Sequence, residues 1–77
     1  MERAWAARAG IGFIGKHGLL ITPGQGSYQI LGEVITTLEL IPDTPMAERC
    51  GACTRCLDAC PTSAFVAPFV LDPRRCI

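Results

Sequence analysis

Four of the five cysteines in this chain of 77 residues fall within one short run, which reads CGACTRCLDACP from Cys50 to Pro61. The spacing is C-x₂-C-x₂-C-x₃-C-P, so the four thiols can bind together only if the chain folds closely around what they hold. Gly51 and Ala52 are small, which lets backbone N–H groups of the first turn face the bound group. The hydrophobic core of a chain this short is only marginally stable without a bound metal group or another cross-link. The cysteine run therefore constrains the fold strongly.

This spacing is typical of the cysteines that bind [4Fe–4S] clusters in bacterial-type ferredoxins. Cys50, Cys53 and Cys56 would take three corners of one cluster, while the x₃ step places Cys60 on a helical turn that faces a second cluster. A zinc site is the alternative, but zinc usually takes paired C-x₂₋₄-C units that are a dozen or more residues apart. Disulfides are disfavoured, because five thiols cannot all pair and no export signal precedes them. We therefore predict iron–sulfur ligation.

Cys76 lies sixteen residues beyond Cys60. It is either a second ligand of the Cys60 cluster or a buried structural thiol. Two cubane clusters need about eight thiolates. Because the chain holds five, we expect the other three outside these 77 residues.

The glycine-rich stretch GIGFIGKHG at residues 10–18 resembles two nucleotide-binding patterns. It satisfies G-x-G-x-x-G and nearly satisfies G-x-x-x-x-G-K-[ST], with His17 in place of the hydroxyl residue. Both patterns need a strand before the loop and a helix after it. Here a helix is expected before the loop and a strand after it, so we predict no nucleotide. Two roles for the glycines remain. They allow close packing of a connecting segment, or they allow the backbone to approach a large ligand other than a nucleotide, with Lys16 and His17 as its polar contacts.

The rest of the pattern predicts short elements of an α+β fold. Tyr28 to Leu40 alternates apolar and mixed residues at period two, which favours a long strand with one buried face. Asp72-Pro73 resembles a helix start, so a helix is expected near Arg74. The other expected elements are a helix at 2–9, a loop at 10–18, strands at 19–22, 65–66 and 69–71, turns or linkers at 23–26 and 42–45, and a helical turn at 57–60.

Charge and hydropathy restrict the partners. Seven Lys and Arg residues balance seven Asp and Glu residues, so the chain shows no strong electrostatic footprint for nucleic acid. That balance does not exclude a nucleic acid held mainly by other parts of a larger protein. No uncharged apolar run approaches the roughly 20 residues that cross a bilayer, and the N-terminus lacks a signal-peptide core. We expect a cytoplasmic protein without a membrane partner.

Several segments together resemble the epoxyqueuosine reductases, which are cobalamin-dependent iron–sulfur enzymes of queuosine biosynthesis in tRNA. RAWAARAGIGFIGKHGLLI resembles the segment A-x-x-A-G-[IL]-G-[FW]-x-G-K of that family, and GSYQILGEVITTLEL resembles the sheet region after it. CGACTRCLDACPTSA and LDPRRCI resemble the first ferredoxin motif and the cysteine that follows. One departure is Ser63, where the family usually has Gly.

The resemblance implies an internal segment of such an enzyme. Residues 1–44 would be the C-terminal part of a cobalamin-binding α/β sheet domain, and residues 45–77 the N-terminal part of a ferredoxin-like [4Fe–4S] domain. The implied ligands are Cys50, Cys53 and Cys56 for one cluster and Cys60 and Cys76 for the other. The implied cobalamin contacts are Gly15, Lys16, His17 and Ser27.

The implied activity is the reduction of epoxyqueuosine to queuosine in tRNA, with clusters that pass electrons from an external donor to cobalamin. No catalytic residue is assigned, because Asp43, Asp58 and Asp72 do not match the family's general-acid motif. The 77 residues alone are expected to be inactive. Two alternatives remain, a ferredoxin-like electron-transfer module and a related cobalamin-dependent reductive dehalogenase.

Overall fold

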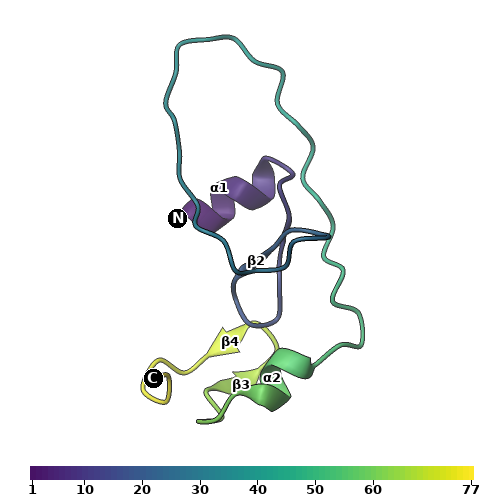
Figure 1. Ribbon diagram of the computed structural model, residues 1–77, viewed down its shortest axis with the longest axis vertical. Coiled ribbons are helices and arrows are strands. Elements are labelled where there is room, and N and C mark those ends of the chain that lie inside the picture. Colours follow the sequence, from purple (N-terminus) through teal and green to yellow (C-terminus); the bar gives the residue numbers. More distant parts are fainter.

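The computed structural model describes residues 1–77 and divides them into two small units joined by a long irregular segment (Figure 1). Each unit combines one short helix with one two-stranded antiparallel sheet. The elements are α1 (Glu2–Arg8), β1 (Phe13–Ile14) and β2 (Leu20–Ile21) in the first unit, and α2 (Arg55–Ala59), β3 (Phe65–Ala67) and β4 (Val70–Leu71) in the second. The α+β class expected from the sequence is confirmed.

The first unit packs α1 against the β1–β2 hairpin. Alanine favours the helix, and α1 ends before Gly10, whose φ of +76° continues the chain in a conformation that glycine adopts easily. Ala6, Phe13 and Leu20 form the buried core of this unit. The predicted helix at 2–9 and the strand at 19–22 are confirmed to within two residues. The region 10–18 is not a loop throughout, because β1 lies inside it.

The second unit places the β3–β4 hairpin after α2. The helix stops before Pro61, and Ala64 is almost fully buried at 1% exposure. The predicted helical turn at 57–60 and the strands at 65–66 and 69–71 are therefore confirmed, although α2 begins two residues earlier. The two helices of the chain have seven and five residues, and neither is long and apolar enough to cross a membrane.

The helix predicted near Arg74 is wrong. Residues 73–75 form a single turn, in which the Arg75 N–H donates to the Asp72 carbonyl at 3.1 Å. The Asp72 carboxylate does accept the Arg74 N–H at 3.0 Å, as a capping residue would. The backbone bond joins residues three apart rather than four apart, so the cap closes a turn and no α-helix follows.

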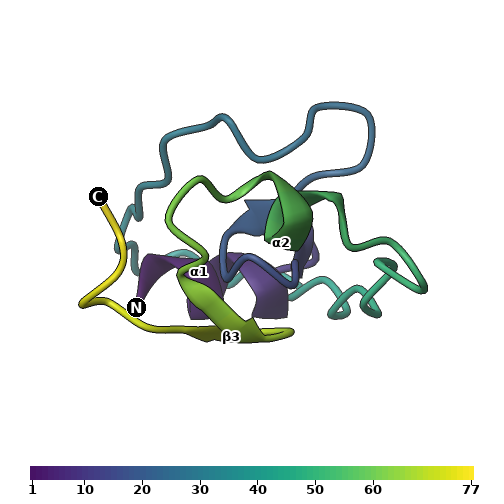
Figure 2. The same cartoon turned by 90° about the horizontal axis from the view of Figure 1, so that it is seen from below.

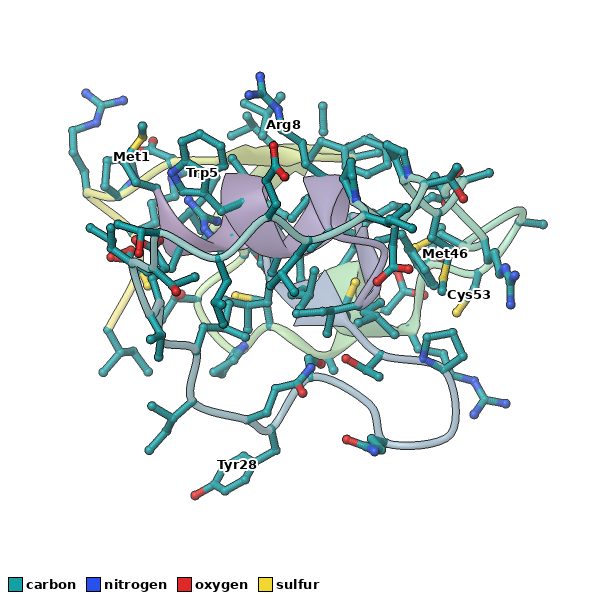
Figure 3. All side chains as sticks on the ribbon, turned by 90° about the horizontal axis from the view of Figure 1, so that it is seen from above. Met1, Trp5, Arg8, Tyr28, Met46 and Cys53 are labelled. Atoms are coloured by element: carbon teal, nitrogen blue, oxygen red, sulfur yellow. The ribbon has the colours of Figure 1, made fainter.

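The long strand predicted from Tyr28 to Leu40 is also wrong. Residues 28–49 contain no helix or strand; residues 31–35 line a hollow with α1, and the segment then forms the long arch in Figure 1. Most of its large apolar side chains are exposed, and Tyr28 points away from the rest of the molecule in Figure 3. A period-two pattern becomes a strand only where another strand supplies backbone hydrogen bonds. Each sheet of this chain has two strands, and neither pairs with this segment.

The loop between β1 and β2 connects the two units. It reaches toward α2 and the β3–β4 hairpin, and Figure 2 shows the same proximity from below. The backbone N–H of Phe69, in the β3–β4 turn, donates to the Lys16 carbonyl at 2.8 Å. Residues more than fifty positions apart in the sequence are thus held together at this loop.

Two residues other than glycine adopt a left-handed backbone, Ser63 with φ of +51° and Phe69 with φ of +67°. Such angles are uncommon for side chains with a Cβ, and for a bulky residue they indicate strain. Ser63 is the position where the resemblance noted in the sequence leads us to expect Gly. Glycine adopts such a backbone without the steric penalty of a Cβ.

Ser63→Gly is expected to stabilise the protein by about 1 kcal/mol, because removing the Cβ relieves the left-handed strain. Ser63→Ala keeps the Cβ and serves as the matched control, with little expected change. The free energy of urea unfolding of each full-length variant measures the effect. Equal values for Ser63→Gly and Ser63→Ala would show that the strain is absent.

Candidate metal centre

The loop that carries the first three cysteines is built from a tight turn followed by α2. The N–H of Cys53 donates to the Cys50 carbonyl at 2.9 Å, and Gly51 between them has a φ of +54°. Cys56 lies within α2, and the Cys53 side chain is at the exposed edge of the loop (Figure 3). Every cysteine of the chain is a free thiol.

Cys50 is the half-buried end of this loop. Burial raises the pKa of the Cys50 thiol, and the Lys16 backbone N–H and ammonium oppose that rise by favouring the thiolate. The carboxylate of Glu48 accepts the Cys50 backbone N–H, and its negative charge acts against the thiolate. Metal binding requires the thiolate, so Lys16 favours the form of Cys50 that can be a ligand.

Cys60 lies in a different environment at the end of α2. Its sulfur accepts the backbone N–H of Ala64 at 3.3 Å and lies 3.6 Å from the Thr62 hydroxyl. These hydrogen bonds, with that of Ala64 the strongest, lower the pKa of the Cys60 thiol. The left-handed backbone of Ser63 closes the turn that makes them possible. Cys60 is therefore prepared to act as a thiolate ligand.

Cys76 is exposed, and its thiol lies 3.9 Å from the Ile77 carbonyl as its one hydrogen-bond partner. The alternative that Cys76 is a buried structural thiol is therefore wrong for these 77 residues. Exposure leaves its sulfur accessible to a bound group.

The donor set of the loop fits an iron–sulfur cluster. Its four side chains are all thiols, the soft ligands that select iron–sulfur clusters or zinc. No three Cys, His, Asp or Glu side chains of the chain are grouped so that they could hold one metal ion. The choice between the two metals therefore rests on the C-x₂-C-x₂-C-x₃-C-P spacing, which is typical of clusters and unusual for zinc.

Lys16 reaches the cysteine loop directly from the β1–β2 turn. Its Nζ donates to the carbonyl oxygens of Gly51 at 2.8 Å and of Cys53 at 2.9 Å. The sequence placed this residue in the glycine loop and gave no sign of the contact, because the partners are 35 and 37 residues away. Lys16 thus belongs to the surroundings of the cysteine site.

His17 and Ser27 are brought together, as two candidate contacts of one site should be. The His17 Nε2 lies 3.1 Å from the Ser27 hydroxyl, and its Nδ1 accepts the Leu19 N–H at 3.1 Å. An accepting Nδ1 leaves the proton of the neutral ring on Nε2, which then donates to Ser27. Partial burial lowers the pKa of His17, in agreement with a neutral ring.

Gly15 is buried beneath these side chains. A Cβ at this position would lie 2.5 Å from the Ile21 Cδ1 and 2.8 Å from the His17 Cε1. A larger residue here would displace the side chains of Ile21 and His17. A substitution at Gly15 would disturb the hairpin whether or not a ligand lies against it.

The order of elements around the glycine loop is α1, β1, turn, β2. Neither nucleotide-binding pattern has this context, because both place a helix directly after the loop. The element order on which the prediction of no nucleotide was based is confirmed.

Comparisons with known proteins agree over the whole chain. Residues 49–77 match the family described as a 4Fe-4S double cluster binding domain. A protein of Synechocystis sp. named epoxyqueuosine reductase is 54% identical over 76 residues, which are 99% of this chain and 26% of that protein. The chain therefore spans about a quarter of that curated relative.

Solved structures give the same answer. A structure of epoxyqueuosine reductase from Bacillus subtilis superposes with a TM-score of 0.89 and 51% identity, over 99% of this chain and 20% of that one. A structure of epoxyqueuosine reductase with an epoxyqueuosine-modified tRNA stem loop matches with the same TM-score, identity and coverage. Both the sequence and the fold of these 77 residues are similar to those of a segment of these epoxyqueuosine reductases, which confirms the resemblance found in the sequence.

Proposed function

We propose that the full-length protein containing this segment reduces epoxyqueuosine to queuosine in tRNA, with [4Fe–4S] clusters that supply electrons to cobalamin. The observation that carries the proposal is the run of free thiols, in which the Cys60 sulfur accepts the Ala64 N–H, within a segment that matches the double-cluster family. The tRNA substrate is proposed from the modified stem loop in the related structure.

The reaction requires two electrons and two protons. They convert the epoxide to the alkene of the cyclopentene ring and release its oxygen as water. When bound, each cluster supplies one-electron transfer, so the reaction needs two successive transfers from an external donor. The residues of this segment contribute by holding the clusters, and we assign the proton donor to none of them.

The proposed ligands follow the two environments of the cysteine loop. Cys50, Cys53 and Cys56 would hold one cluster, on the tight turn and the start of α2. Cys60 and Cys76 would hold the second cluster, together with ligands from outside the segment. The proposed division into residues 1–44 and 45–77 places Lys16 in one domain and its carbonyl partners in the other.

Gly15, Lys16, His17 and Ser27 remain the proposed cobalamin contacts, but the structure restricts what they can offer. The Lys16 amine is engaged by two carbonyls, and His17 and Ser27 are bonded to each other. Gly15 supports the hairpin packing. These side chains do not form a prepared polar site, so we derive no step of the reaction from them.

Anaerobic reconstitution of the full-length protein is expected to give bound iron and sulfide, with broad absorption near about 400 nm, because cubane clusters with thiolate ligands absorb there. With cobalamin and a chemical reductant, the same protein should then convert epoxyqueuosine in a tRNA stem loop to queuosine. Stoichiometric zinc in protein kept free of oxygen would contradict the cluster assignment. Intact clusters without turnover would favour the electron-carrier alternative.

Substitution of single cysteines should separate the two clusters. Cys53→Ala is expected to remove a ligand of the first cluster, and Cys76→Ala a ligand of the second. Cys53 lies in the tight turn before α2, whereas Cys76 follows β4. Mössbauer and EPR spectra of the full-length variants measure each loss. If Cys76→Ala leaves both spectra unchanged, Cys76 is no ligand.

The pair of His17 and Ser27 tests the cobalamin contacts. Ser27→Ala is expected to weaken corrinoid binding severalfold, because it removes the hydroxyl that bonds His17, another proposed contact. Iron should be retained, because the Ser27 hydroxyl lies outside the cysteine loop. Gln25→Ala, in the neighbouring turn, is the matched control. Spectroscopic titration of cobalamin into the full-length protein measures the affinity. Equal affinities for the two variants would remove Ser27 from the proposed contacts.

A further inference from the structure

Lys16 is the one lysine of the chain, and it is placed between the two units rather than in solvent. Its half-buried side chain crosses from the β1–β2 turn to the cysteine loop, where Nζ donates to the carbonyls of Gly51 and Cys53. Both carbonyls belong to the turn that begins at Cys50. The ammonium therefore lies beside the backbone from which two proposed ligands of the first cluster project.

The backbone of Lys16 is fixed as well as its side chain. Its carbonyl accepts the Phe69 N–H at 2.8 Å. Phe69 makes this bond from a left-handed backbone with φ of +67°. A strained conformation persists only where surrounding contacts hold it, and strain of this kind is concentrated at functional sites. Lys16 is thus held against the loop by several separate contacts.

The charge of Lys16 is not neutralised by a carboxylate. None of the ion pairs of the chain includes Lys16, and its two bonds to the loop go to neutral carbonyl oxygens. The nearest acidic influence on Cys50 is Glu48, which bonds the Cys50 N–H and acts in the opposite direction. A full positive charge therefore lies beside this loop.

We propose that Lys16 raises the reduction potential of the cluster held by Cys50, Cys53 and Cys56. The inference rests on the proposed cluster binding. When that cluster accepts one electron from a donor such as dithionite, it gains one negative charge. A neighbouring ammonium stabilises that charge, since the potential of such clusters depends on net charge. Lys16 acts as a positioning residue that makes the first cluster easier to reduce.

The test is an EPR-monitored redox titration of the reconstituted full-length protein. At a fixed potential, Lys16→Met is expected to lower the ratio of reduced to oxidised first cluster about tenfold, a shift of about 59 mV for one electron. Lys16→Arg keeps the charge and should retain most of the potential. Arg55→Met is the matched control, because it removes one positive charge from an exposed side chain on α2 that makes no hydrogen bond or ion pair. The second cluster should titrate as in the unaltered protein.

The outcomes separate this inference from the proposed function. An unaltered protein that assembles no cluster overturns both. Clusters that assemble in every variant, with the same potential for Lys16→Met as for the unaltered protein, overturn only the role of Lys16. A shift for Arg55→Met as large as that for Lys16→Met would also overturn it, because any nearby charge would then suffice. If Lys16→Met loses the first cluster, Lys16→Gln, which keeps a donor for the carbonyls and lacks the charge, replaces it with the same expected shift.

Discussion

The bonds from Lys16 to the cysteine loop are the interaction on which the arrangement of the two units depends. Each unit has few buried residues, and the segment between them contains no helix or strand. The hydrogen bonds between the units come from one residue: the Lys16 amine donates to two carbonyls of the cysteine loop, and the Lys16 carbonyl accepts the Phe69 N–H. A loop that must present thiolates in a fixed geometry is therefore supported from outside its own sequence, in the way that surrounding groups orient the ligands of metal sites.

The sequence was informative wherever local chemistry decides the structure. Alanine and Gly10 define α1 and its end, Pro61 follows the end of α2, and Pro68 lies in the turn between β3 and β4. The strand predicted from Tyr28 to Leu40 was wrong because its formation depends on distant partners. Alternation of apolar and polar residues shows which face could be buried, but not which other part of the chain would cover it. The turn at Asp72 shows a further limit, because a capping residue begins a turn without ensuring that a helix follows.

The sequence predicted the candidate ligands of the site but not the contacts that hold their loop in place. The spacing of the four cysteines is enough to predict a ferredoxin-type site. The departure from the family pattern at Ser63 falls where the backbone is left-handed. The role of Lys16 could not be predicted, because a lysine in a glycine-rich loop is compatible with solvent, a ligand or a distant carbonyl. Gly15 shows the same difficulty, since the side chains that a larger residue would displace are those of Ile21 and His17 within its own hairpin.

The exposed segment after Tyr28 has a consequence for handling these residues apart from the rest of a larger protein. Ile30, Val34 and Ile35 are more than 90% exposed, in an extended stretch rich in β-branched residues whose backbone groups are not paired in a sheet. Such a stretch is a template for strand pairing between molecules. Expressed as an isolated peptide, the segment would therefore associate with copies of itself by forming new strand pairs.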